Sequence, residues 1–236
     1  MQGLIHFNPD RAHQCDHAQA FLSSGFAATP KADGNADVHV VSGPWFALNK
    51  WKHHPRVLMV DRAWWGDSDG YVSIGWLQDD GTRKFAAGSA ARSKPKLNDW
   101  KPMVWETLKE TRCLVLADYG QDVSDIVAQA SQRFLTVNVR EHPADRKRLI
   151  NLQDDIAWHD VAIGTSGTAI FEAIQLGVPV ICLDAKNEVV PVCSDSIQGE
   201  LYRGDRAEWL HDMSYKQWSL AEIASGEAWE HLKDAQ

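Results

Sequence analysis

The chain has 236 residues, of which 44% are hydrophobic and 24% charged, and it carries a net charge of −8. This composition is typical of a globular protein with room for one large domain or two small ones, and the acidic balance argues against bulk electrostatic binding of nucleic acid. No apolar run approaches the roughly 18 residues of a membrane span, and residues 1–7 lack a secretory signal. We therefore expect a cytoplasmic protein without a membrane span.

The sequence contains no motif that indicates metal binding or redox chemistry. The four cysteines form no CxxC pair, and we expect them to be reduced. No group of His, Cys, Asp or Glu has the spacing of a metal site, so we expect no metal and no required cofactor.

Apolar stretches separated by turn residues predict the strands of the first half of the chain. They cover residues 4–7, 37–43, 56–61 and 71–77. The following segment is rich in Ser, Lys and Pro and indicates a connector. We therefore predict a first domain over residues 1–105.

The second half alternates strands with helices, which predicts a parallel sheet covered by helices. The expected strands are residues 112–118, 134–140, 160–164 and 178–184, and the expected helices are residues 123–132, 144–152 and 168–176. A second domain over residues 106–205 follows, with C-terminal helices over 206–236 that pack back on the domains. The predicted fold class is α/β, with two small Rossmann-like domains facing across a cleft.

The stretch GTSGT, residues 164–168, lies between a predicted strand and the helix after it. In a doubly wound sheet, ligands bind where such helices begin, and the first amides of a helix attract anions. Because no capping-box Glu or Gln follows, we expect no side chain to occupy these donors. Thr165, Ser166, Gly167 and Thr168 are therefore candidate phosphate contacts, and a simple N-cap is the alternative.

Glu172 lies outside the apolar stripe of the same helix, about 9 Å along the axis from Ser166 at 1.5 Å per residue. This offset suits a carboxylate that binds a ribose while the attached phosphates lie at the start of the helix. The alternative is an ordinary solvated residue. The sequence contains neither a P-loop nor a GxGxxG fingerprint, and Ser166 does not fit the GxSxG register of a hydrolase.

The segment GTSGTAIFEAIQLGVPVI resembles the carboxy-terminal nucleotide-binding domain of GT-B glycosyltransferases, and VREHP and LADYGQD resemble two further segments of that domain. The resemblance implies a hexosyltransferase that uses a nucleotide-sugar, and we expect a UDP-sugar. The implied donor contacts are Gly120, Gln121, Arg140, His142, Thr165, Ser166, Gly167, Thr168 and Glu172. His142 is also a candidate catalytic residue, because a cation there would offset the charge of the leaving group.

Asp61 is the candidate catalytic base. It ends a predicted strand of the first domain, which is the acceptor side in the implied fold, and a carboxylate there could deprotonate an acceptor hydroxyl. A turn residue that bonds its own backbone is the alternative. If the transfer retains configuration, the donor phosphate could take the proton instead.

Two other segments resemble uncharacterised bacteriophage proteins described as glycosyltransferase-like: residues 61–76 and 206–232. This resemblance suggests a modified base in phage DNA as the acceptor, flipped out and supported by Trp64 or Trp65, with basic residues of 50–56 and 92–101 on the phosphates. A phage-encoded protein would act in the host cytoplasm. A bacterial glycan or a protein is the alternative acceptor. An epimerase and a non-catalytic nucleotide-sugar-binding protein are the alternative functions, and the sequence leaves the oligomeric state open.

Overall fold

The protein divides into two compact units, Met1–Ser93 with Leu210–Gln236, and Lys94–Trp209. The computed structural model describes residues 2–29, 35–43, 51, 54–64, 70–88, 101, 109–143 and 150–235. Within these residues, no helix is both long and apolar enough to cross a membrane.

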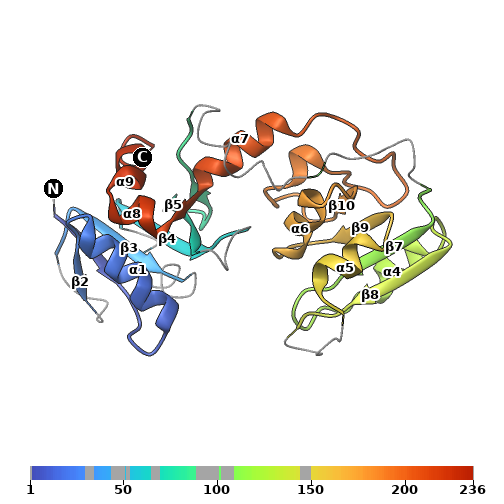
Figure 1. Ribbon diagram of the computed structural model, residues 1–236, viewed down its shortest axis with the longest axis horizontal. Helices are drawn as coiled ribbons and strands as arrows, with labels where there is room; N and C mark the ends of the chain where they lie inside the picture. Colours follow the sequence, from blue (N-terminus) through green and yellow to red (C-terminus); the bar gives the residue numbers. More distant parts are fainter. Residues whose placement is uncertain are drawn as a thin grey trace. The chain divides into compact units, whose positions relative to one another are not determined.

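The first unit is built on a mixed sheet with the strand order β11-β5-β4-β3-β1-β2, and β6 pairs with β5 (Figure 1). The strands are β1 (Gly3–His6), β2 (Ala27–Thr29), β3 (Val38–Ser42), β4 (Val57–Arg62), β5 (Tyr71–Leu77), β6 (Arg83–Lys84) and β11 (Gln217–Ser219). Strands β2, β1, β3 and β4 run parallel, whereas β5 is antiparallel to β4, β6 and β11. The four strands predicted in this half are therefore present.

Helices cover one face of this sheet. They are α1 (Ala12–Ser23), α8 (Leu220–Ala224) and α9 (Glu227–Leu232), and α7 (Ala207–Lys216) leads into β11. Figure 1 shows α1 and α8 side by side, and their side chains share one apolar core with alternate residues of the strands. Trp76 and Trp218 are almost fully buried in this core, and the Trp76 Nε1 donates to the Leu232 carbonyl at 2.6 Å. The C-terminal tail is thus part of the core of the first unit.

The second unit has an entirely parallel sheet among its described strands, in the order β10-β9-β7-β8. Its elements are β7 (Arg112–Leu116), α4 (Ser124–Ala130), β8 (Thr136–Arg140), α5 (Leu152–Ala157), β9 (Val161–Gly164), α6 (Ala169–Gln175), β10 (Val180–Cys182) and the 3-10 helix η4 (Val190–Val192). The predicted α/β class is confirmed, since both units consist of sheets flanked by helices. The helix expected over residues 144–152 falls mostly outside the described part of the chain, which omits 144–149, and the described helix α5 begins at Leu152.

Asp160 fixes the amino-terminal edge of this second sheet. Its buried carboxylate accepts hydrogen bonds from the backbone N–H groups of Thr111 and Arg112, from the Thr111 hydroxyl and from the Arg112 guanidinium, all at 2.9–3.0 Å. Burial alone would raise the pKa of Asp160, but these donors outweigh it and hold the pKa well below its usual range. The start of β7 is thereby tied to the start of β9.

The first unit contains three buried histidines among its described residues, His6, His17 and His39. His17 Nδ1 lies 3.0 Å from Ser42 Oγ, and His6 Nε2 lies 2.8 Å from His39 Nδ1. The His39 ring also stacks on Trp51 with the ring centroids 4.4 Å apart. Burial, together with the charge of neighbouring histidines, lowers the pKa of both His17 and His39 to about 4.

We predict that the first unit loses stability as the pH falls from about 6.5 to 4. Unfolded histidines bind protons below pH 6.5, whereas the folded His17 and His39 stay neutral until about pH 4, so each costs about 3 kcal/mol at pH 4. Urea unfolding of the wild type and of His39→Gln at pH 7, 5.5 and 4.5 measures this, and the variant should show a shallower loss. Equal pH dependence in both proteins would contradict the prediction.

Candidate functional site

The carboxyl ends of β7, β8 and β9 lie at one edge of the second sheet, because the three strands are parallel neighbours. Residues predicted to contact the sugar-nucleotide donor lie at the end of each of these strands or just after it. The loop after β7 contains Gly120 and Gln121, Arg140 ends β8, and the turn after β9 begins at Thr165. The topology therefore brings three separate sequence segments to one place.

The turn after β9 is occupied by the carboxylate of Asp118, from the loop after β7. Asp118 Oδ2 accepts hydrogen bonds from Thr165 Oγ1 at 2.6 Å, from Ser166 Oγ at 2.6 Å and from the Ser166 backbone N–H at 3.1 Å. The expectation that no side chain occupies the donors of this turn is wrong. A capping-box search covers only the helix's own residues, whereas this acceptor comes from the neighbouring strand.

The second half of the turn, Gly167 and Thr168, has backbone N–H groups that are not engaged in this way. The backbone N–H groups of Gly167 and Thr168 bond to no described residue, and both residues are exposed. Gly167 has φ +83°, a conformation that glycine adopts without strain. A Cβ at this position would lie 2.8 Å from Asp118 Oδ1, so a side chain here would crowd the carboxylate.

Gln121 ties the loop after β7 to the same turn. Its Oε1 accepts from the Asp118 backbone N–H at 2.9 Å, and its Nε2 donates to Thr165 Oγ1 at 3.3 Å. The preceding Gly120 has φ +65°, and no atom of the described residues lies within 4 Å of the position of a Cβ. On the other side, Asn187 Nδ2 donates to the Thr165 carbonyl at 3.1 Å. The turn is therefore held from both of its flanks.

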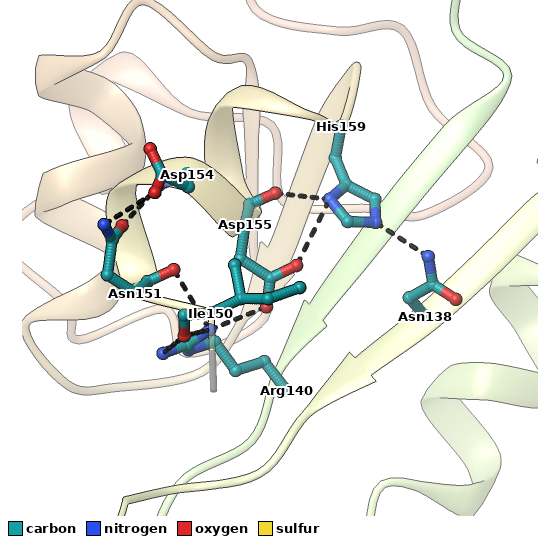
Figure 2. Close-up of polar contacts among 7 residues, drawn as sticks. All are labelled: Asn138, Arg140, Ile150, Asn151, Asp154, Asp155 and His159. Atoms are coloured by element: carbon teal, nitrogen blue, oxygen red, sulfur yellow. Dashed lines mark hydrogen bonds and ion pairs between the residues drawn. The ribbon is translucent and has the colours of Figure 1, made fainter. Parts of the chain in front are cut away.

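Arg140 is engaged by other residues of the protein (Figure 2). Its Nη1 lies 2.7 Å from Asp155 Oδ2, and its guanidinium also donates to the carbonyls of Ile150 and Asn151 at 3.3–3.4 Å. Both members of the Arg140–Asp155 pair are largely buried, with side chains 11% and 10% exposed. Both terminal nitrogens of the Arg140 guanidinium, Nη1 and Nη2, are thus bonded within the protein.

Behind this pair lies a buried histidine. His159 Nδ1 is 2.6 Å from the Asp155 carbonyl, and His159 Nε2 is 2.9 Å from Asn138 Nδ2 (Figure 2). Because the Asn138 amide nitrogen can only donate, Nε2 accepts, and the imidazole proton lies on Nδ1. His159 therefore holds the end of α5 against β8. Sequence reasoning missed both Asp155 and His159, since neither belongs to a motif.

Glu172 lies half-buried on α6. Burial raises its pKa, and the charge of Arg140 opposes this rise. Two residues predicted to contact the donor are therefore close enough to interact electrostatically.

His142 follows β8 and packs edge-on against Tyr119, with the ring centroids 5.8 Å apart. Tyr119 is 70% exposed, so one face of the pair is open to solvent.

Asp61, the candidate base, lies in the first unit. It lies one residue before the end of β4, which continues to Arg62, and its Oδ1 accepts a hydrogen bond from the Arg62 backbone N–H at 2.8 Å. Of the two candidate stacking residues, Trp64 is half-buried with the Arg83 guanidinium 5.3 Å from its ring centroid. Trp65 and most of the two basic stretches lie outside the described residues.

A polar cavity of about 600 Å³ lies at the opposite edge of the second sheet, near the amino ends of β7 and β8. It is lined by Glu110, Gln132, Arg133, Gln198, Gly199, Glu200, Leu201 and Arg203. The Arg133 guanidinium is engaged there by Glu110 at 3.0 Å and by the Ile197 carbonyl at 2.6 Å. Across the described part of the chain, no three His, Cys, Asp or Glu side chains are grouped so as to hold a metal ion.

No protein-family model matches this sequence, and no curated protein matches it. Two solved structures are similar to the whole chain or most of it. One is Thermosulfurimonas dismutans KpsC, beta Kdo 2,7 transferase, with a TM-score of 0.59, 11% identity and 100% of both chains covered. The other is the beta Kdo 2,4 transferase of KpsC from the same organism, with a TM-score of 0.53, 14% identity, and 90% of this chain and 91% of that chain covered. At these identities the likeness shows the fold.

We predict that Asp155→Ala lowers the free energy of unfolding by about 3 kcal/mol, because it leaves the buried Arg140 guanidinium without its carboxylate. The double variant Arg140→Met with Asp155→Leu should recover most of this loss, since it removes both charges. Urea unfolding measures the free energy of unfolding of the single and the double variant, with the exposed Asp125→Asn as the control. Equal loss in the single and double variants would contradict a role for the charge pair.

Proposed function

We propose that this protein is a glycosyltransferase that moves a sugar from a nucleotide-sugar to a hydroxyl acceptor. The observation that carries the proposal is the likeness to two structures titled as Kdo transferases, one of which extends over the full length of both chains. Function is a property of the site rather than of the fold, so the proposal also needs a site suited to the reaction.

The carboxyl edge of the second sheet supplies a site of the right kind. The N–H groups of Gly167 and Thr168 lie at the start of α6 and bond to no described residue, so we assign the donor phosphates to them. Thr165 and Ser166 lie behind this position and contact Asp118. A phosphate would reach their hydroxyls only by displacing that carboxylate.

The other donor contacts follow from this placement. Glu172 would bind ribose hydroxyls, with Arg140 beside it balancing its charge. Gly120 and Gln121 would border the phosphates from the loop after β7. His142, when protonated, would offset the charge of the leaving nucleotide. Asp61 of the first unit remains the proposed base toward the acceptor.

For the donor we propose a UDP-linked hexose, as the sequence resemblance implies, and we include Kdo among the sugars to be tested because the titles of the similar structures name it. For the acceptor we propose a bacterial glycan. A modified base in phage DNA and a protein are the alternatives.

A second candidate function is nucleotide-sugar binding without catalysis. It is favoured by Asp118, because the carboxylate takes up three hydrogen-bond donors of the turn that a phosphate could otherwise use. The two functions differ in one observable, namely the release of nucleotide when an acceptor is present.

We predict that one family among UDP-, GDP-, CMP- and ADP-linked sugars raises the unfolding temperature. A ligand at a hundred times its Kd adds about 2.7 kcal/mol of stability. Glu172→Gln should abolish most of this shift, because the ribose loses a charged acceptor, while Asp125→Asn should keep it. Stabilisation followed by nucleotide release on adding glycan acceptors supports the transferase, and stabilisation without release on any acceptor supports the non-catalytic binder. No stabilisation by any of these compounds would contradict both.

A further inference from the structure

The two oxygens of the Asp118 carboxylate have different surroundings. Oδ2 accepts three hydrogen bonds, from the two hydroxyls of Thr165 and Ser166 and from the Ser166 N–H. Oδ1 accepts none from any residue that the structure describes. The backbone beneath is fixed as well, because the Asp118 N–H donates to Gln121 Oε1 at 2.9 Å. The carboxylate is thus held in one orientation with one oxygen unused.

The unused oxygen faces Gly167. A Cβ at that position would lie 2.8 Å from Oδ1, which is closer than a carbon and an oxygen normally approach. The absence of a side chain at residue 167 therefore leaves the approach to Oδ1 open on this side. Asp118 is only half-buried, so a ligand atom can reach it from solvent.

An ionised carboxylate accepts hydrogen bonds and donates none, so the group that completes Oδ1 must be a donor. A phosphate diester has no hydrogen-bond donor to offer at neutral pH, so it does not supply the group that Oδ1 accepts from. A sugar or ribose hydroxyl does donate, and a hydrogen bond to a charged acceptor is stronger than one to a neutral acceptor.

We infer that Asp118 Oδ1 binds a hydroxyl group of the nucleotide-sugar, next to the phosphates on Gly167 and Thr168. This inference rests on the proposed function and adds to it Asp118, a residue of the LADYGQD segment that the resemblance did not assign to the donor. N–H groups that can donate to a phosphate then lie beside a carboxylate oxygen that can accept from a hydroxyl. This combination matches a sugar ring that carries a phosphate. The hydroxyl belongs either to the ribose or to the transferred sugar, and the experiment below separates these two sources.

Asp118→Asn is the sharpest variant, because it keeps the size of the side chain. If the amide oxygen takes the place of Oδ2 against Thr165 and Ser166, the amide N–H₂ stands where Oδ1 was, and an acceptor has become a donor. The probes are the UDP-, GDP-, CMP- and ADP-linked sugars and the same nucleotides without sugar. Kd is measured by calorimetry for the wild type, Asp118→Asn and the exposed control Asp125→Asn, with unfolding temperature and amide NMR spectra as checks of folding.

The expected result is a loss of at least tenfold in affinity in Asp118→Asn and a change of less than twofold in Asp125→Asn. A loss confined to the nucleotide-sugar assigns the hydroxyl to the transferred sugar, and an equal loss for the sugar-free nucleotide assigns it to the ribose. Gly167→Ala, which places a methyl group against Oδ1, should weaken binding in the same direction and serves if Asp118→Asn does not fold.

Wild-type affinity in a folded Asp118→Asn, or in Gly167→Ala if Asp118→Asn does not fold, would overturn the inference and leave the proposed function intact. It would mean that Asp118 serves only to fix the turn. If none of the probes binds the wild type, the proposed function fails, and the inference fails with it.

Discussion

Parallel pairing of β7 with β8 and β9 is the constraint on which the candidate site depends. Parallel strands end at the same edge, so the strand pairing itself brings together loops that are far apart in the sequence. Asp118 and Ser166 are 48 residues apart and share a hydrogen bond for this reason. The same pairing places Arg140 at the end of the adjacent strand, near Glu172.

The charges at this edge are largely balanced within the protein. Asp118 is bound by hydroxyls and an amide, Arg140 by Asp155 and two carbonyls, and Glu172 lies within the field of Arg140. Among the described residues, positive potential at this edge therefore comes mainly from the backbone N–H groups at the start of α6.

The sequence predicted the regular part of this structure well. Strands with continuous apolar runs, such as residues 112–118 and 178–184, were found close to their expected positions because burial on both faces leaves a clear pattern. Helix α1 was missed, since the only large apolar residues of AHQCDHAQAFLS are Phe21 and Leu22, and its buried face includes His17. The tail was expected to be helical throughout, but Trp218 lies in β11, a short strand whose pairing with β5 only the tertiary fold provides.

The candidate site was only partly predictable for a related reason. Motif reasoning placed Thr165–Thr168, Gln121 and Glu172 at a sheet edge, where the structure finds them. It did not anticipate that Asp118 binds the turn or that Asp155 binds Arg140, because both contacts join residues on different elements.

Whether the site binds a donor is tested most directly by hydrogen exchange of the wild type with and without the stabilising nucleotide-sugar. The account predicts slower exchange in residues 117–122 and 165–172. Protection confined to the cavity around Arg133, or to the first unit, would contradict it.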